Sequence, residues 1–164
     1  MPTIVDYASL VQSIADFQVR SDLGAYADYF IQSAEDDIYN DIFTLNQGRG
    51  VAALEASFSG AVTNGALALP PSYLGLRYVT VAIGGAAYPL QRRTTEFIYA
   101  KYPQQSPTGV PAFIGRSGAN FIFGPYPDAA YNIVGIYWMR SAALSAANPT
   151  TWMITEIPTA LFAA

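Results

Sequence analysis

The sequence contains neither cysteine nor histidine. Without these side chains the protein cannot form a Cys/His zinc site, a Ser-His-Asp or Cys-His catalytic group, a His- or Cys-ligated haem, or a disulfide. The absence of cysteine is compatible with an oxidising or a reducing compartment, so it leaves the compartment open. Any chemistry must therefore depend on the remaining polar, charged and aromatic side chains.

Charge is also scarce, because charged residues make up 12% of the 164 residues and apolar residues 52%. That charged fraction is about half the usual share. A chain with so little charge must expose apolar surface, and its 12 tyrosines are typical of interfaces. We therefore expect an obligate oligomer, with a monomer that has a tyrosine-rich β core as the alternative.

Long apolar runs are missing as well. No run approaches the length of about 18 residues that a membrane-spanning helix needs, so we expect no contact with a membrane. Asp6 and Asp16 lie within a helical pattern near the N-terminus, which argues against a signal peptide.

The few charges are unevenly distributed. Residues 1–47 carry eight acidic residues and one basic residue, a net charge of −7, whereas residues 48–164 carry four acidic and seven basic residues, +3. This asymmetry suits a head-to-tail ring in which the acidic part of one copy meets the basic part of the next. A solvated acidic helix pair explains it equally well. The basic part is too dilute for a dedicated DNA-binding surface.

Apolar residues at helical spacing predict one helix over residues 6–19 and a second over about 23–46. Asp6 supplies a negative charge at the start of the first helix, and Ser21-Asp22 offers a cap for the second. One face of the second helix is apolar: Ala27, Ile31, Ala34, Ile38, Ile42 and Leu45.

Three aromatic residues of the second helix, Tyr29, Tyr39 and Phe43, lie off that apolar face. A helix that is apolar on two sides usually packs on two partners. We expect one partner to be the β domain of the same chain and the other to be a neighbouring subunit, with these three residues at the contact between subunits.

From Val51 the apolar period changes to two, which is typical of strands. The predicted strands are 52–59, 66–69, 76–83, 86–90, 111–116, 119–123 and 131–139. Hairpin turns are expected at Asn64-Gly65, the strongest signal, and at Gly84-Gly85 and Ser117-Gly118. Strand 131–139 is apolar on both faces, so we expect a central or interface strand.

A short helix is expected over 94–102, capped by Thr94 or Thr95 and ended by Pro103. The fold class is therefore α+β: an N-terminal helix pair packed on a mostly antiparallel, sandwich-like β domain with one inserted helix. The expected organisation is a single domain, 1–164, with a helical part over about 5–47, a β-rich part over about 51–157 and a C-terminal helix from about 158.

The best catalytic candidates are Asp37 and Asp41, which are four residues apart on the second helix. They could act as a glycosidase acid and base, or bind calcium or magnesium, but we expect a solvated or salt-bridged acidic helix. No phosphate-binding glycine motif is present. Tyr126, Trp138 and Trp152 could form a sugar-binding platform, although aromatic residues at strand spacing usually belong to a core. We expect no enzyme, no cofactor and no metal.

Two segments resemble the head–tail connector, or adaptor, proteins of tailed bacteriophages. The first is Leu69-Pro70-Pro71-Ser72-Tyr73-Leu74-Gly75-Leu76-Arg77-Tyr78-Val79, similar to the family's entry into a central strand. The second runs from Tyr126 to Phe162. It contains a Tyr-Pro-Asp-Ala-Ala-Tyr turn, a strand, a Leu-Ser segment and Asn-Pro-Thr-Thr-Trp before a closing helix. The family normally continues through a longer C-terminal helix and arm than this sequence shows.

The resemblance implies a virion structural protein that forms a ring, commonly dodecameric, beneath the portal protein. Such a ring supplies the platform for the next neck or tail protein, and genomic DNA passes through its centre without specific binding. We expect a location at the neck after assembly in the host cytoplasm. The candidates for charged pairing across interfaces are Arg77, Arg92, Arg93 and Arg140. The alternatives are another phage tail or minor capsid component and a carbohydrate-binding β module.

Overall fold

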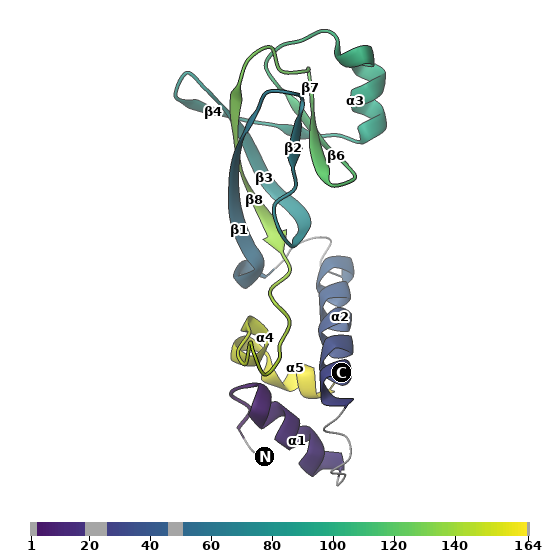
Figure 1. Cartoon of the computed structure of the whole chain (residues 1–164), viewed down its shortest axis with the longest axis vertical. Coiled ribbons are helices and arrows are strands. Elements are labelled where there is room, and N and C mark those ends of the chain that lie inside the picture. Colours follow the sequence, from purple (N-terminus) through teal and green to yellow (C-terminus); the bar gives the residue numbers. More distant parts are fainter. Residues whose placement is uncertain (1–2, 19–25, 46–50, 164) are drawn as a thin grey trace. The chain divides into compact units, whose positions relative to one another are not determined.

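The computed structural model describes residues 3–18, 26–45 and 51–163. Contacts divide the chain into two compact units: a helical unit, Met1–Leu54 with Ser141–Ala164, and a β unit, Glu55–Arg140 (Figure 1). Helices near both ends of the chain and two sheets between them confirm the α+β class. The single-domain organisation expected from the chain length stays a prediction.

Among the described residues, the helical unit contains four α-helices and one short 3-10 helix. They are α1 (Tyr7–Gln18), α2 (Ala27–Leu45), η2 (Ala52–Leu54), α4 (Trp152–Glu156) and α5 (Pro158–Ala163). The two predicted N-terminal helices and the helical start after Pro158 are confirmed. Helix α4 was not predicted, because five residues are too few to show a helical period.

Helix α1 begins with a reciprocal cap between Asp6 and Ser9. The backbone N–H of Ser9 donates to the Asp6 carboxylate at 2.8 Å, and the N–H of Asp6 donates to the Ser9 hydroxyl at 3.0 Å. This arrangement satisfies two of the N–H groups that a helix start leaves without partners. The backbone N–H of Tyr7 donates to the carbonyl of Pro149 at 2.8 Å, which ties the start of α1 to the C-terminal segment.

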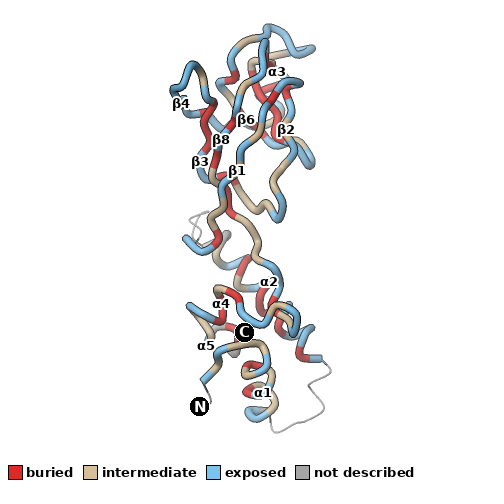
Figure 2. Tube along the Cα trace, turned by 60° about the vertical axis from the view of Figure 1, so that its left-hand side comes forward, coloured by how far each residue is buried: buried red, intermediate tan, exposed pale blue. Residues whose placement is uncertain are grey.

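The first half of the predicted apolar face of α2 is buried within the helical unit, whereas Ile38 and Ile42 are half-buried. Figure 2 draws the buried residues of this helix in red. Ala27, Ile31 and Ala34 are each at most 5% exposed. Helix α2 packs against α5, where Leu161 is buried, and α4 contributes Met153 and Ile154 to the buried set. The N-terminal and C-terminal segments therefore share one core, which the sequence pattern did not predict.

The β unit consists of two four-stranded sheets. The first has the order β1-β8-β3-β4, and the second has the order β2-β7-β6-β5. Their bounds are β1 Glu55–Val62, β2 Ala66–Ala68, β3 Tyr73–Ile83, β4 Ala86–Pro89, β5 Gln91–Arg92, β6 Phe113–Ser117, β7 Asn120–Gly124 and β8 Tyr131–Met139. All pairs are antiparallel except β5 with β6.

The two sheets share one apolar core. Its buried members come from both sheets: Val62, Leu76, Val79, Val81, Leu90, Ile114, Phe121, Phe123 and Ile133. Phe58 of the first sheet stacks on Phe121 of the second, with ring centroids 5.5 Å apart. The sandwich-like arrangement expected for the β part is therefore present.

Strand β8 lies between β1 and β3, which confirms the central position predicted for it. Its residues alternate as a pleated strand requires. Ile133, Gly135 and Tyr137 are buried, and Ile133 belongs to the shared core. Val134 and Ile136 lie on the other face, where Val134 is 42% exposed and Ile136 is half-buried.

Two of the three predicted hairpins are confirmed, and the strongest signal is wrong. Gly84-Gly85 joins β3 to β4, and Ser117-Gly118 joins β6 to β7, each within one sheet. Asn64-Gly65 instead leads from β1 in one sheet to β2 in the other. The positive φ of Gly65, 66°, serves a corner between sheets, and the Tyr126 ring occupies the space where a side chain at this position would lie.

Helix α3 (Thr95–Lys101) confirms the predicted inserted helix. The Thr94 side chain accepts a hydrogen bond from the backbone N–H of Phe97, so Thr94 is the N-cap. The helix lies against β6 and β7 of the second sheet. Its position brings a new set of charged and aromatic residues together at the surface.

Candidate interaction surfaces

Two carboxylates of α2 were the catalytic candidates that the sequence offered. Asp37 and Asp41 are both exposed on α2. The residues that the structure describes contain no group of three or more acidic side chains placed to hold a metal ion. In the same described ranges, no helix is long and apolar enough to cross a membrane.

Glu35 differs from the other acidic residues of α2, because its carboxylate is buried and bound to a backbone N–H. Its side chain is 2% exposed and accepts a hydrogen bond at 3.1 Å from the backbone N–H of Leu144. This carboxylate binds the C-terminal segment inside the helical unit. The helical period could not separate it from Asp36 and Asp37, which are exposed.

The three aromatic residues predicted for the subunit contact have different environments. Tyr29 is 70% exposed, and its neighbour Phe30 is 47% exposed. Tyr39 is 5% exposed, and its hydroxyl lies 2.7 Å from the Ser141 hydroxyl and accepts from the indole N–H of Trp152. Tyr39 therefore stabilises the interior of its own unit. The Phe43 side chain lies outside the described residues.

A second apolar surface is the face of the first sheet that points away from the shared core, here called the outer sheet face. Strand register and burial place these residues on it: Ser57, Ser59, Tyr78, Thr80, Val134, Ile136 and Trp138. Tyr78 is 53% exposed. None of these seven side chains is charged, and two of them, Thr80 and Trp138, are buried at 8% and 6% exposed.

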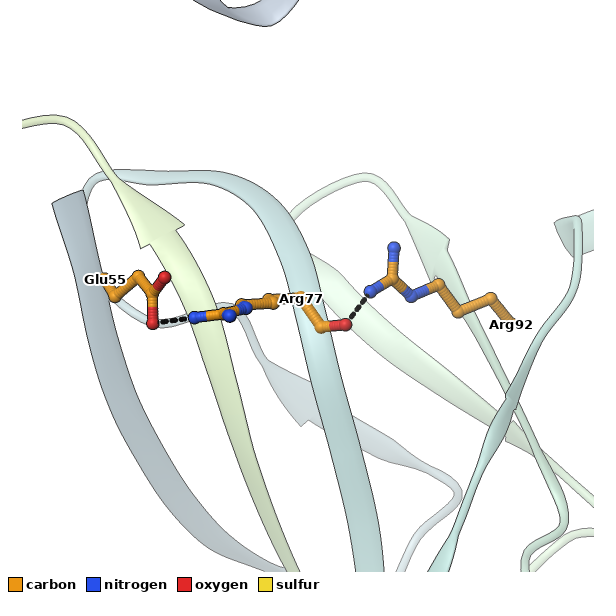
Figure 3. A network of polar contacts seen from close by, with 3 residues as sticks. All are labelled: Glu55, Arg77 and Arg92. Atoms are coloured by element: carbon orange, nitrogen blue, oxygen red, sulfur yellow. Dashed lines mark hydrogen bonds and ion pairs between the residues drawn. The ribbon is translucent and has the colours of Figure 1, made fainter. Parts of the chain in front are cut away.

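Arg77 lies at one end of the outer sheet face and is held by its own unit. Its guanidinium forms an ion pair with Glu55, and it covers the Trp138 ring with its Cζ 5.4 Å from the ring centroid. The Nη2 of Arg92 donates to the Arg77 carbonyl (Figure 3). A pair this exposed contributes little stability, so its value lies in fixing the direction of the side chains.

The charge concentrated around α3 forms a third surface, here called the α3 patch: Arg92, Arg93, Phe97, Lys101 and Phe113. The Lys101 ammonium lies 4.6 Å from the Phe113 ring centroid and 5.6 Å from that of Phe97. Arg93 approaches the same two rings at 5.9 and 5.3 Å. A shallow depression of about 470 Å³ borders Arg92, Arg93, Thr94 and Phe97.

Sequence reasoning identified the Arg92-Arg93 pair but missed Lys101, Phe97 and Phe113. The sequence did hold a partial signal, because Phe97 and Lys101 are four residues apart on a predicted helix. Phe113 could not have been found this way, since the fold alone brings β6 beside α3.

The remaining candidates have contacts inside their own units. The backbone N–H of Arg140 donates to the Ser72 carbonyl at 2.8 Å, and its side chain is half-buried. The three aromatic residues considered for sugar binding are also used internally. Tyr126 packs at Gly65, Trp138 lies under Arg77, and Trp152 contacts Tyr39 edge-to-face.

The family model of the SU10 adaptor proteins matches residues 5–164. No curated protein matches the chain.

Proposed function

Because this chain belongs to the SU10 adaptor protein family, and is thus a structural adaptor of a phage virion, we propose that it forms a closed homo-oligomeric ring of twelve copies. The ring lies at the neck, between the portal protein and the next neck or tail protein. In this role it acts by shape and surface matching, without catalysis, cofactor or metal. Assembly takes place in the host cytoplasm.

The main support for the proposed ring is the presence of two unlike apolar surfaces on one chain. One is the exposed aromatic start of α2, with Tyr29 and Phe30, and the other is the outer sheet face with Tyr78 and Val134. Exposed apolar surface of this kind marks interaction sites. Each of these surfaces can meet an unlike surface of a neighbouring copy, and such head-to-tail contacts close into rings when the rotation between copies permits.

Introducing a negative charge at Tyr29 tests the ring. Tyr29→Asp should prevent assembly while leaving the fold intact, because the side chain is 70% exposed and loses few internal contacts. Tyr29→Phe is the matched control and should assemble like the parent protein, since it keeps an aromatic side chain at this position. Native mass spectrometry would compare the two, and equal assembly of both variants would contradict a role for this surface.

Charge supports a second part of the proposal, the passage of DNA. The helical unit carries nine acidic and two basic residues, a net charge of −7. An acidic lining would let DNA slide, because few lysines and arginines mean few phosphate contacts and little counterion release. Cryo-electron microscopy of the neck would test this. Helical units that face solvent outside the ring would remove the acidic-lining proposal and leave the ring itself standing.

Docking to the portal is tested by imaging the purified protein with and without portal rings. Negative-stain images should show added density at one end of the portal, with the adaptor as a second ring. Adaptor that never co-localises with portal rings, while still self-associating, would favour another position in the tail.

A further inference from the structure

The α3 patch holds two cations that keep their charge available for a partner. Lys101 and Arg93 rest on the rings of Phe97 and Phe113. Among the described residues no carboxylate forms an ion pair with either cation, and the Arg93 Nη2 donates to the neutral Gln91 Oε1 at 3.1 Å. The face of an aromatic ring attracts a cation but does not neutralise its charge.

The patch is rigidly supported, so its geometry does not need to form on binding. The backbone N–H of Arg93 donates to the Ile114 carbonyl at 2.9 Å, and the Thr95 hydroxyl donates to the Arg116 carbonyl at 2.6 Å. Gly115 permits this close approach, because a Cβ there would lie 2.9 Å from the Arg93 carbonyl oxygen. Binding to a surface held in place costs less ordering entropy.

The chain itself contains a surface of complementary character on α2. Its exposed residues combine acids and aromatic side chains: Asp36, Asp37, Asp41, Tyr29 and Phe30. The α3 patch likewise combines cations with a partly exposed aromatic residue, Phe97 at 36%. At the level of whole units, the β unit has six basic and three acidic residues, +3, against −7 for the helical unit.

We propose that the α3 patch of one copy docks on the exposed face of α2 of the next copy, with Arg93 and Lys101 opposite the carboxylates of Asp37 and Asp41. This inference rests on the proposed ring and names its charged contact. Complementary charge at such a contact steers encounter and fixes register. DNA fits the patch less well, because a phosphate-binding surface usually engages more cations than the three present here.

The test compares charge reversals in the full chain by sedimentation velocity at about 50 and about 300 mM salt. Arg93→Glu/Lys101→Glu should weaken self-association at least about tenfold at the lower salt. Asp37→Lys/Asp41→Lys should weaken it similarly, and the four changes together should restore most of the affinity. The difference between the parent and either double variant should shrink at the higher salt, because exposed charges are then screened.

Arg116→Glu provides the matched control for Lys101→Glu, since both change the charge by the same amount. Arg116 lies on the opposite face of β6, where its guanidinium covers the Tyr73 ring at 5.4 Å. We expect Arg116→Glu to leave self-association unchanged and Lys101→Glu to reduce it. Circular dichroism melting of every variant would separate loss of contact from loss of fold.

Three results would overturn the inference. Self-association that is unaffected by the reversals would place the ring contact elsewhere and leave the ring intact. Binding of a double-stranded DNA probe that is lost in Lys101→Glu, with self-association unchanged, would assign the patch to nucleic acid. A parent chain that remains monomeric at every concentration would remove the ring and the charged contact together.

Discussion

Individual residues inside the helical unit explain why its N-terminal and C-terminal segments stay together. The chain returns from the β unit at Ser141, and its next residues are bound to α2 by polar contacts. Glu35 accepts from the Leu144 backbone, and the Tyr39 hydroxyl contacts both Ser141 and Trp152. Buried polar groups of this kind contribute mainly by leaving no donor or acceptor unsatisfied.

Substitution of Glu35 tests this contact. Glu35→Gln keeps an oxygen that can accept from the Leu144 N–H, whereas Glu35→Leu leaves that buried donor without its acceptor. We expect the free energy of unfolding of the leucine variant to be lower than that of the glutamine variant by about 1–3 kcal/mol. Urea denaturation followed by circular dichroism would measure both, and equal midpoints would show that the hydrogen bond does not matter.

The Asp6 cap makes a prediction about pH. The backbone N–H of Ser9, followed by the Ser9 hydroxyl, lowers the pKa of the Asp6 carboxyl from its ordinary value. A carboxyl whose pKa is lower in the folded state stabilises the fold above its unfolded pKa, and loses this effect as the pH falls through the folded pKa. We therefore expect the first turn of α1 to fray at acidic pH. An NMR titration in which Asp6 shows an ordinary pKa would contradict the cap.

Single helices and strands were predicted well where a local sequence pattern determines them. They were predicted poorly where pairing with a distant strand determines them. Apolar residues on both faces, such as Ile133 and Val134, were enough to predict that β8 is a central or interface strand. The Thr94-Thr95 pair was enough to predict the start of α3. Asn64-Gly65 has the composition of a hairpin turn, yet the chain crosses there to the other sheet. Period and turn chemistry indicate faces and bends, but they do not indicate which strand pairs with which.

The candidate surfaces were predictable to the same limited extent. Tyr29 was found because it lies off the apolar face of α2. Tyr39 satisfied the same criterion, but the C-terminal segment covers it. The sequence of α2 gives no sign of the C-terminal segment that covers Tyr39, because that segment lies about 100 residues away in the sequence. The exposed surface of a helix is thus fixed by tertiary contacts that the helix sequence does not contain.

The central strand β8 provides a prediction at the scale of one element. Gly135 lies between β1 and β3, and a Cβ at this position would come within 2.5 Å of the Phe58 ring and 2.8 Å of the Tyr78 carbonyl oxygen. Because the backbone oxygen cannot move aside easily, we expect Gly135→Ala to lower the free energy of unfolding by about 1–3 kcal/mol. Thermal melting would measure the loss.

Gly75→Ala in β3 is the matched control. The nearest atom to a Cβ at Gly75 is the Trp138 Cδ1 at 3.6 Å, an ordinary contact distance. We expect a change within about 0.5 kcal/mol, as for most substitutions that meet no obstacle. Equal destabilisation by the two alanines would show that loss of glycine, and not the crowding around β8, is responsible.

At the scale of the whole molecule, scarcity of charge and exposure of aromatic residues have the same consequence. Tyr29, Phe30, Tyr78 and Val134 leave apolar area in water that a second copy can cover. Burial of that area favours association, and the uneven charge selects the orientation. Folding and assembly should therefore be thermodynamically linked, because a neighbour binds the folded chain and not the unfolded one.

This linkage predicts that the melting temperature depends on protein concentration. At a concentration about 100 times the dissociation constant, a neighbour adds about 2.7 kcal/mol of stability. For a chain of this length that corresponds to a rise of about 5–10 °C. Differential scanning calorimetry over a wide concentration range should show the rise for the parent chain and for Tyr29→Phe. Tyr29→Asp should melt at one temperature throughout, because it cannot gain the contact. A parent melting temperature that stays constant over that range would mean that the folded chain gains nothing from its neighbours, and a ring held by these surfaces could not then be stable.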